Sequence, residues 1–294
     1  MTNAFKRIVR PVMLSPISRI ISGIVLLNVG LFIQRNLVQL ALSALAVENE
    51  ILISTFIFAI RILGLIFIYT LLVKAFEGRK PAEIAIKKAT VKQLTRGAEI
   101  GILCIGFIFG MNWLSGWVSV ENVNESPDIL EGIYYTVFFV LLQDFVHFLI
   151  LFRITEKYLG TYLTILICGL IFGFKHSLFP DYTFISGIII FIDVTFIFSA
   201  LFLWSRSLWE IFGFHLAYNI TQNIILGNPS IAGIQSVLKL SVNGPAILAG
   251  DPSGFETSII AVTFCIGVGG YLLNVTRNQG WIMKPYWIKK INPP

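Results

Sequence analysis

Three short segments decide how this chain folds: residues 143–147 read QDFVH, residues 172–176 read FGFKH, and residues 215–219 read HLAYN. They lie in three apolar stretches and hold all three histidines of the chain. Polar and ionisable groups inside a membrane span are costly and by default mark a functional site, with one another as partners. We therefore expect these segments to meet inside a helix bundle for which the rest of the chain is scaffold.

The composition indicates a membrane protein. Hydrophobic residues make up 56% of the 294-residue chain and charged residues only 13%, and the mean hydropathy is +0.81. A soluble domain would carry about twice that share of charge. Several apolar runs reach the roughly 18–20 residues that a bilayer-spanning helix requires. We predict an all-α, polytopic membrane helix bundle, and the ordinary soluble globular class is excluded.

About eight spans are expected. A small-residue stretch at 41–44 resembles a signal-peptide cleavage region, but Arg35 interrupts that layout, so we interpret the first apolar run as a helix. Residues 74–96 are rich in Lys and Arg and predict an amphipathic segment at the membrane surface. The expected spans are residues 20–33, 51–73, 100–118, 133–152, 162–179, 184–204, 208–226 and 257–275.

The distribution of positive charge predicts the orientation. With eight spans and both termini in the cytoplasm, all but four of the 22 Lys and Arg fall on the cytoplasmic side; the exceptions are Arg35, Arg61, Lys175 and Lys239. Residues 121–131 form an acidic outer loop without Lys or Arg. The net charge of +6 is therefore explained by orientation and anionic lipid. We expect a multi-pass protein of the plasma membrane with the lipid bilayer as partner and no nucleic acid.

Each of the three helices places its polar residues on one face, because residues three and four apart are neighbours on a helix. Interhelical hydrogen bonding is the structural alternative for such residues. Arg61 and Asp193 are also within spans, where an ion pair or a helix anchor is the expected role. The stripes are Gln143, Asp144 and His147; Gly169, Phe172, Gly173 and His176; and His215, Tyr218, Asn219 and Gln222.

The cysteines give no sign of a metal site. Cys104, Cys168 and Cys265 stand singly in apolar stretches, with no zinc-ligand spacing. We expect neither a metal ion nor a cofactor.

In this order and topology, Phe172-x-x-x-His176 followed by His215-x-x-x-Asn219 resembles the CPBP family of intramembrane endopeptidases, which includes CAAX prenyl proteases, Abi proteins and the lysostaphin-resistance protein. The resemblance covers roughly residues 130–227. It implies metal-free hydrolysis by a glutamate and a histidine that activate water, with a second histidine and an asparagine stabilising the oxyanion. By position, His176 would assist the water, and His215 and Asn219 would form the oxyanion hole.

The same resemblance divides the chain into three parts of one integral bundle. Residues 1–129 are N-terminal membrane helices with the basic amphipathic segment, and residues 130–227 are the CPBP-like core. Residues 228–294 comprise a loop, the last membrane helix and a basic tail.

The first motif of that family, Glu-Glu-x-x-x-Arg, is altered here. Gln143 stands at the position of the catalytic glutamate and Phe148 at that of the arginine. A carboxamide cannot accept a proton from water, and base catalysis commonly contributes 10²–10⁴-fold. Two interpretations stay open: Asp144, with His147 and His176, forms a substitute base for hydrolysis of membrane-associated or prenylated peptides, or the site only binds such peptides, as an immunity or assembly factor would. A transporter is a weaker alternative, because buried Asp, His and Lys also serve proton-coupled carriers.

Overall fold

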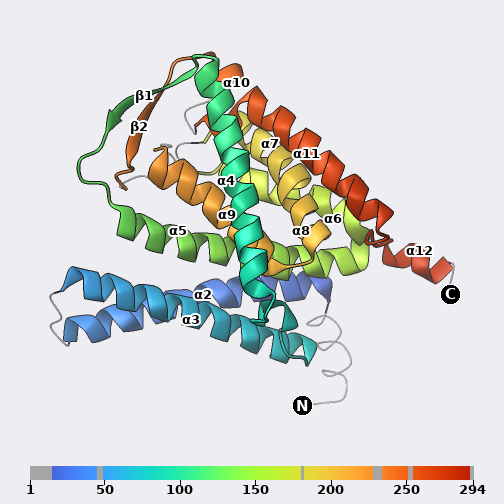
Figure 1. Ribbon diagram of the computed structural model, residues 1–294. Coiled ribbons are helices and arrows are strands. Elements are labelled where there is room, and N and C mark those ends of the chain that lie inside the picture. The colour runs from blue at the N-terminus through green and yellow to red at the C-terminus, as the bar shows by residue number, and fades with distance from the viewer. Residues whose placement is uncertain (1–14, 45–48, 180–181, 228–233, 251–253, 292–294) are drawn as a thin grey trace.

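The computed structural model describes residues 15–44, 49–179, 182–227, 234–250 and 254–291. Helices dominate, and one small sheet lies at the side of the bundle (Figure 1). The α-helices are α2 (Pro16–Ala44), α3 (Glu50–Glu77), α4 (Thr90–Leu114), α5 (Ile129–Asp144), α6 (Arg153–His176), α7 (Phe184–Asp193), α8 (Ser199–Ser205), α9 (Leu208–Asn219), α10 (Ala246–Ala249), α11 (Ile259–Asn278) and α12 (Tyr286–Ile291). Short 3₁₀ turns are Ala82–Ile84 and Phe255–Thr257.

Six helices of the described chain are long and apolar enough to cross a membrane. They are Pro16–Ala44, Glu50–Glu77, Thr90–Leu114, Ile129–His176, Phe184–Ser205 and Ile259–Asn278. The fourth is 48 residues long, more than twice the length that a span requires, and Gly160 interrupts it with φ 74°. The all-α prediction is confirmed. The count of eight spans stays a prediction, since residues 208–225 are not among the six.

The helices form two groups (Figure 1). Helices α2 and α3 lie side by side along one flank, and α4 crosses over α9 within the main group. Asn49 caps α3 by accepting a hydrogen bond from the backbone of Leu52, and Ser207 caps α9 in the same way through Glu210. Each cap satisfies one of the backbone donors left open at a helix start.

Residues 74–96, which the sequence predicts as an amphipathic segment at the membrane surface, comprise the end of one helix, a short turn and the start of the next helix. Helix α3 continues to Glu77, and Gly78 ends it in the left-handed conformation with φ 66°. A 3₁₀ turn follows at Ala82–Ile84, and α4 begins at Thr90. Arg79 in this connection is bonded to Glu77 and Glu83. Arg79 therefore takes part in local ion pairs.

A two-stranded antiparallel sheet was not foreseen. Strand β1 (Val118–Val123) pairs with β2 (Leu238–Val242), with Val118 opposite Val242 and an irregularity between Val120 and Asn122. The strands connect the segment after α4 to the segment before α11. The first three residues of the predicted acidic loop, 121–123, thus belong to a strand that pairs with a distant part of the chain.

Three π-helical segments interrupt the helices of the core. Phe145–Phe152 follows α5, Val194–Phe198 follows α7, and Ile220–Ile225 follows α9. The residues directly before them are Asp144, Asp193 and Asn219. A π segment bonds residue i to i+5 and widens the turn, and such segments occur often at functional sites. Polar residues of the core therefore stand where the helical period changes.

Candidate functional site

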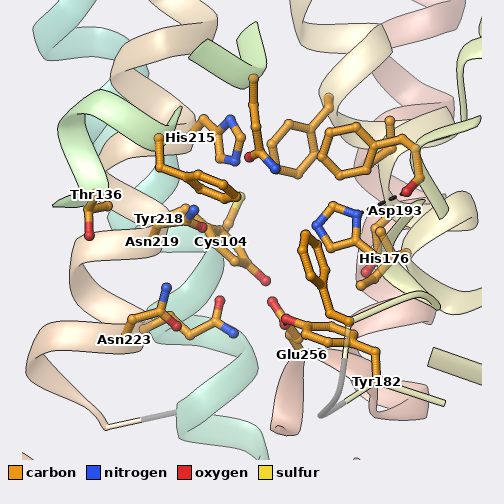
Figure 2. A pocket seen from close by; sticks show the side chains of 18 of the residues that line it. Cys104, Thr136, His176, Tyr182, Asp193, His215, Tyr218, Asn219, Asn223 and Glu256 are labelled. Carbon is orange, nitrogen blue, oxygen red and sulfur yellow. Dashed lines mark hydrogen bonds between the residues drawn. The ribbon is translucent and has the colours of Figure 1, made fainter. Parts of the chain in front are cut away.

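A cavity of about 490 Å³ lies within the core. Residues of α4 to α7, α9 and α11 contribute to its wall (Figure 2). Its lining is Cys104, Glu131, Tyr135, Thr136, Phe139, Gln143, Phe172, His176, Phe179, Tyr182, Ile190, Asp193, Val194, Ile197, Phe198, His215, Tyr218, Asn219, Gln222, Asn223, Ile234, Glu256 and Cys265.

Glycines bring the helices that carry the histidines close to their neighbours. A Cβ at Gly97 would lie 2.0 Å from the Glu210 carbonyl oxygen, so α4 and α9 touch backbone to backbone. A Cβ at Gly173 would lie 2.3 Å from the carbonyl oxygen of Gly187, so α6 and α7 do the same. Small residues let helix backbones approach in this way. His176 is fixed less than one turn beyond that contact.

His215 is oriented by a buried carboxylate on another helix. Its Nδ1 lies 2.8 Å from Oδ1 of Asp144, which joins α9 to the end of α5. An ionised carboxylate only accepts, so Nδ1 carries the proton and Nε2 of the neutral ring is left as an acceptor. The Phe198 ring contacts the imidazole edge to face, with centroids 5.0 Å apart. The ring of His215 is thus held from two sides, and it lines the cavity.

His176 is held by its own helix and by aromatic rings. Its Nδ1 lies 2.9 Å from the backbone oxygen of Phe172, so Nδ1 donates and Nε2 is again the acceptor. The Phe172 ring stacks on the imidazole at 4.4 Å, and Phe179 and Tyr182 contact it edge to face. Figure 2 shows His176 and His215 on different walls of the cavity.

Most of the predicted site residues meet in this one cavity. Gln143, Phe172, His176, His215 and Asn219 all line it, although they come from three helices far apart in the sequence. The full stripe of the third helix, which adds Tyr218 and Gln222, lines it as well. The expectation that the polar stripes converge is therefore confirmed for these residues.

Asp144 and His147 do not line the cavity. Asp144 is 1% exposed and reaches it only through His215. His147 is 4% exposed, and its ring packs edge to face on Phe172, 5.1 Å away. The substitute base expected from Asp144, His147 and His176 around one shared cavity is not formed. The π segment after Asp144 explains the loss, since its wider turn does not continue the α-helical stripe to His147.

Three carboxylates of the cavity were not among the predicted site residues. Asp193 was expected to anchor a helix, yet it lines the cavity, as do Glu131 and Glu256. An intramembrane carboxylate is itself a signal for function, so Asp193 could have been found from the sequence. Glu256 lies in the segment before α11 and bonds to Tyr182, 3.1 Å away, and no sequence pattern points to that contact.

Buried polar atoms without a hydrogen-bond partner gather around the cavity. In the described chain they include Thr136 Oγ1, Gln143 Nε2, Asp193 Oδ1 and Gln222 Oε1, all from lining residues. Asp144 Oδ2 and His147 Nε2, just behind the wall, are also unpartnered. Buried polar groups in folded proteins are nearly always bonded, so this concentration is typical of a surface that receives polar groups from a ligand or water. No group of three or more His, Cys, Asp or Glu residues suited to a metal ion is found among the described residues.

Comparison with protein-family models, with curated proteins and with solved structures finds no match to this chain.

Proposed function

We propose that this chain is a membrane protein of the CPBP type that binds a membrane-associated peptide in the cavity. The observation that carries the proposal is the convergence of Gln143, Phe172, His176, His215 and Asn219 on one space of about 490 Å³. A cavity of this size, mostly apolar with a few convergent polar groups, is typical of a ligand site. The plasma membrane is the proposed location, with both termini in the cytoplasm.

Binding without cleavage is favoured because Gln143, and not a glutamate, stands at the sequence position of the base that the CPBP mechanism uses. Gln143 lines the cavity where that glutamate would stand, and its Nε2 has no partner. An amide can hold a peptide carbonyl by donating from Nε2, but it cannot take a proton from water. Asn219 also lines the cavity and offers a second side-chain amide. Together they can bind a peptide backbone.

Intramembrane peptide hydrolysis is the second candidate, and the pair of Asp144 and His215 favours it. A carboxylate on Nδ1 fixes the tautomer and stabilises the imidazolium, which is the role of the aspartate in a hydrolytic triad. His215 would then be the general base acting on water through Nε2, with Asn219 as an oxyanion donor. This assignment differs from the roles implied by the resemblance, in which His215 stabilises the oxyanion.

The test measures peptide binding and peptide-bond cleavage by the purified protein in liposomes. The substrates are a prenylated CAAX-type peptide and a library of membrane peptides. Wild type is compared with Gln143→Glu, which restores a carboxylate, with Gln143→Met as its uncharged control, and with Asp144→Asn. We expect wild type to bind without cleaving and Gln143→Glu to gain cleavage, by up to about 10²–10⁴-fold over background, the usual contribution of a general base.

The other outcomes separate the candidates. Cleavage by wild type that disappears in Asp144→Asn would replace the first candidate with the second. Neither binding nor cleavage in any folded variant would contradict both.

A further inference from the structure

The charged groups on the cavity wall are all acidic. Glu131, Asp193 and Glu256 line it from α5, α7 and the turn before α11, and no Lys or Arg is present in the described lining. Two basic side chains lie nearby: Lys175 Nζ is 5.7 Å from the ring centre of Phe139, and Arg61 lies over the neighbouring Phe138. Neither lines the cavity, so a ligand inside it meets carboxylates and no competing cation on the wall.

Asp193 is the carboxylate that most needs a partner. It is 8% exposed, it lines the cavity, and its Oδ1 has no hydrogen-bond partner. The Cys265 thiol bonds to the carboxyl group, but a thiol is a weak donor. A carboxylate removed from water is costly unless it is paired. Figure 2 shows Asp193 beside His176 and on the same side as Glu256.

Aromatic rings surround these carboxylates. The faces and edges of Tyr135, Phe139, Phe172, Phe179, Tyr182, Phe198 and Tyr218 form much of the wall. Cations are attracted to aromatic faces, and the attraction grows when the site excludes water. Carboxylates combined with rings form the environment that binds an ammonium or guanidinium group.

We propose that the cavity selects peptides by a cationic group, a Lys or Arg side chain or an N-terminal amine, held by Asp193 and Glu256 among the aromatic rings. This inference rests on the proposed function, because it names the class of peptide that the same cavity binds. The cation enters the space beside His176 and pairs with Asp193 Oδ1. The amides of Gln143 and Asn219 are left for the peptide backbone.

The test compares one labelled apolar host peptide of about 20 residues, long enough to span a bilayer, with a single guest position occupied by Lys, Arg, norleucine or Glu. Binding is measured by fluorescence anisotropy to the full-length protein in nanodiscs of zwitterionic lipid, so that lipid charge does not contribute. The Lys or Arg peptide is expected to bind about 30-fold or more tightly than the norleucine peptide, the ratio expected for loss of one partner of a buried charge pair. Comparing the affinities of the Lys and Arg peptides shows whether the site prefers an ammonium or a guanidinium group.

Three variants test whether the preference for the Lys or Arg peptide over the norleucine peptide arises in the cavity. Asp193→Asn should reduce the ratio by at least tenfold, an order of magnitude that a buried charge pair allows. Glu256→Gln should reduce it by a smaller factor, and it keeps the test decisive if Asp193→Asn does not fold. Glu121→Gln is the matched control, because Glu121 pairs with Lys239 at an exposed position outside the cavity. It should leave the ratio unchanged.

The experiment distinguishes a failure of this inference from a failure of the proposed function. Equal binding of all four peptides to wild type, or a ratio unaffected by both cavity variants, would overturn the inference and leave the proposed function standing. If no guest peptide binds, including norleucine, the proposed function fails together with the inference.

Discussion

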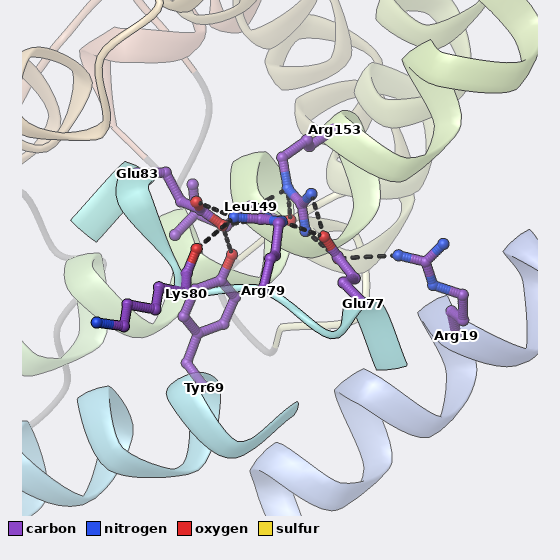
Figure 3. A network of polar contacts seen from close by, with 8 residues as sticks. All are labelled: Arg19, Tyr69, Glu77, Arg79, Lys80, Glu83, Leu149 and Arg153. Atoms are coloured by element: carbon purple, nitrogen blue, oxygen red, sulfur yellow. Dashed lines mark hydrogen bonds and ion pairs between the residues drawn. The ribbon is translucent and has the colours of Figure 1, made fainter. Parts of the chain in front are cut away.

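Two polar clusters in this molecule have opposite characters. In the first, Glu77 accepts from Arg19, Arg79 and Arg153, so that α2, α3 and α6 are joined through one carboxylate (Figure 3). Glu83 in turn accepts from Arg79 and from Tyr69. In the second, the cavity, carboxylates and amides face a space and several of their atoms have no partner. We call the first cluster the Glu77 network.

This difference in hydrogen bonding indicates that the two clusters have different roles. Every carboxylate oxygen of Glu77 and Glu83 is bonded to a guanidinium, so both carboxylates are paired within the protein and serve the fold; Arg19 Nε is the one buried network atom without a partner among the described residues. The cavity has Asp193, Gln143 and Gln222 incompletely bonded, which costs stability that only a ligand or water can offset. Substitutions in the Glu77 network should therefore destabilise the folded protein. Substitutions in the cavity should change peptide binding more than the stability of the fold.

The largest effect is expected for Glu77→Ala. It removes the acceptor of three arginines, of which Arg19 is 13% exposed, and leaves their charges crowded together. Breaking a buried ion pair costs about 3–5 kcal/mol, and the partial exposure of Arg79 and Arg153 places the expected loss near the lower end, about 3 kcal/mol. Thermal unfolding in detergent measures it.

The control for this variant is Glu121→Ala. Glu121 also makes one ion pair, with Lys239 at 3.1 Å, but both side chains are well exposed. The expected loss of stability is small, because ion pairs between exposed side chains contribute little. Similar losses in the two variants would mean that the Glu77 network does not hold the helices together.

A smaller effect is expected for Gly173→Ala. The new Cβ would lie 2.3 Å from the Gly187 carbonyl oxygen, so α6 and α7 must separate and His176 must move. Overpacking of this kind costs about 1–3 kcal/mol, and peptide binding should weaken with it. Gly106→Ala on α4 is the matched control, because nothing lies within 4 Å of its Cβ; it should leave binding unchanged and should not lower the unfolding temperature, since Ala has the higher helix propensity. Unchanged binding in Gly173→Ala would contradict the role of this helix contact in placing His176.

Thr136→Val should act in the opposite direction on stability. Thr136 is 2% exposed, lines the cavity and has an unpartnered Oγ1. Replacing an unsatisfied hydroxyl by an isosteric methyl removes a desolvation penalty of about 1 kcal/mol, so the protein should unfold at a higher temperature while binding its peptide more weakly. Thr70→Val is the control, since Thr70 Oγ1 donates to the Ile66 oxygen and is not in the cavity. A loss of stability in Thr136→Val would show that its hydroxyl is already satisfied.

The smallest effect is a pH dependence of the Glu77 network. Burial acts to raise the pKa of Glu83, but hydrogen bonds from Arg79 and Tyr69 outweigh it and hold the pKa below its ordinary 4.5. A folded-state pKa below the unfolded one means that the unfolded chain binds more protons, so this stability is present above pH 4.5 and is lost as the pH falls through the lowered value. Unfolding temperatures measured from pH 6 downward should fall less steeply in Glu83→Gln than in wild type. Equal slopes would contradict the assignment.

The sequence predicted the helical membrane class and the meeting of Gln143, His176, His215 and Asn219 at one cavity for one physical reason. Polar side chains in apolar spans have few possible partners, so the regular stripes containing His176 and His215 could be expected to converge. The same reasoning failed for His147, because it assumed an α-helical period through residues 145–152.

What the sequence by itself determined is which residues are costly in a membrane: the three histidines, Asp144, Asp193 and the amides of residues 143 and 219. Tertiary structure alone decided which of them share a space. The glycine contacts of α4 with α9 and of α6 with α7 set the distances between helices, and the π segments set which side chains turn inward. The glycine contacts and the π segments take effect only once the helices are packed against one another. The residue pattern along one helix carries no information about the helix beside it.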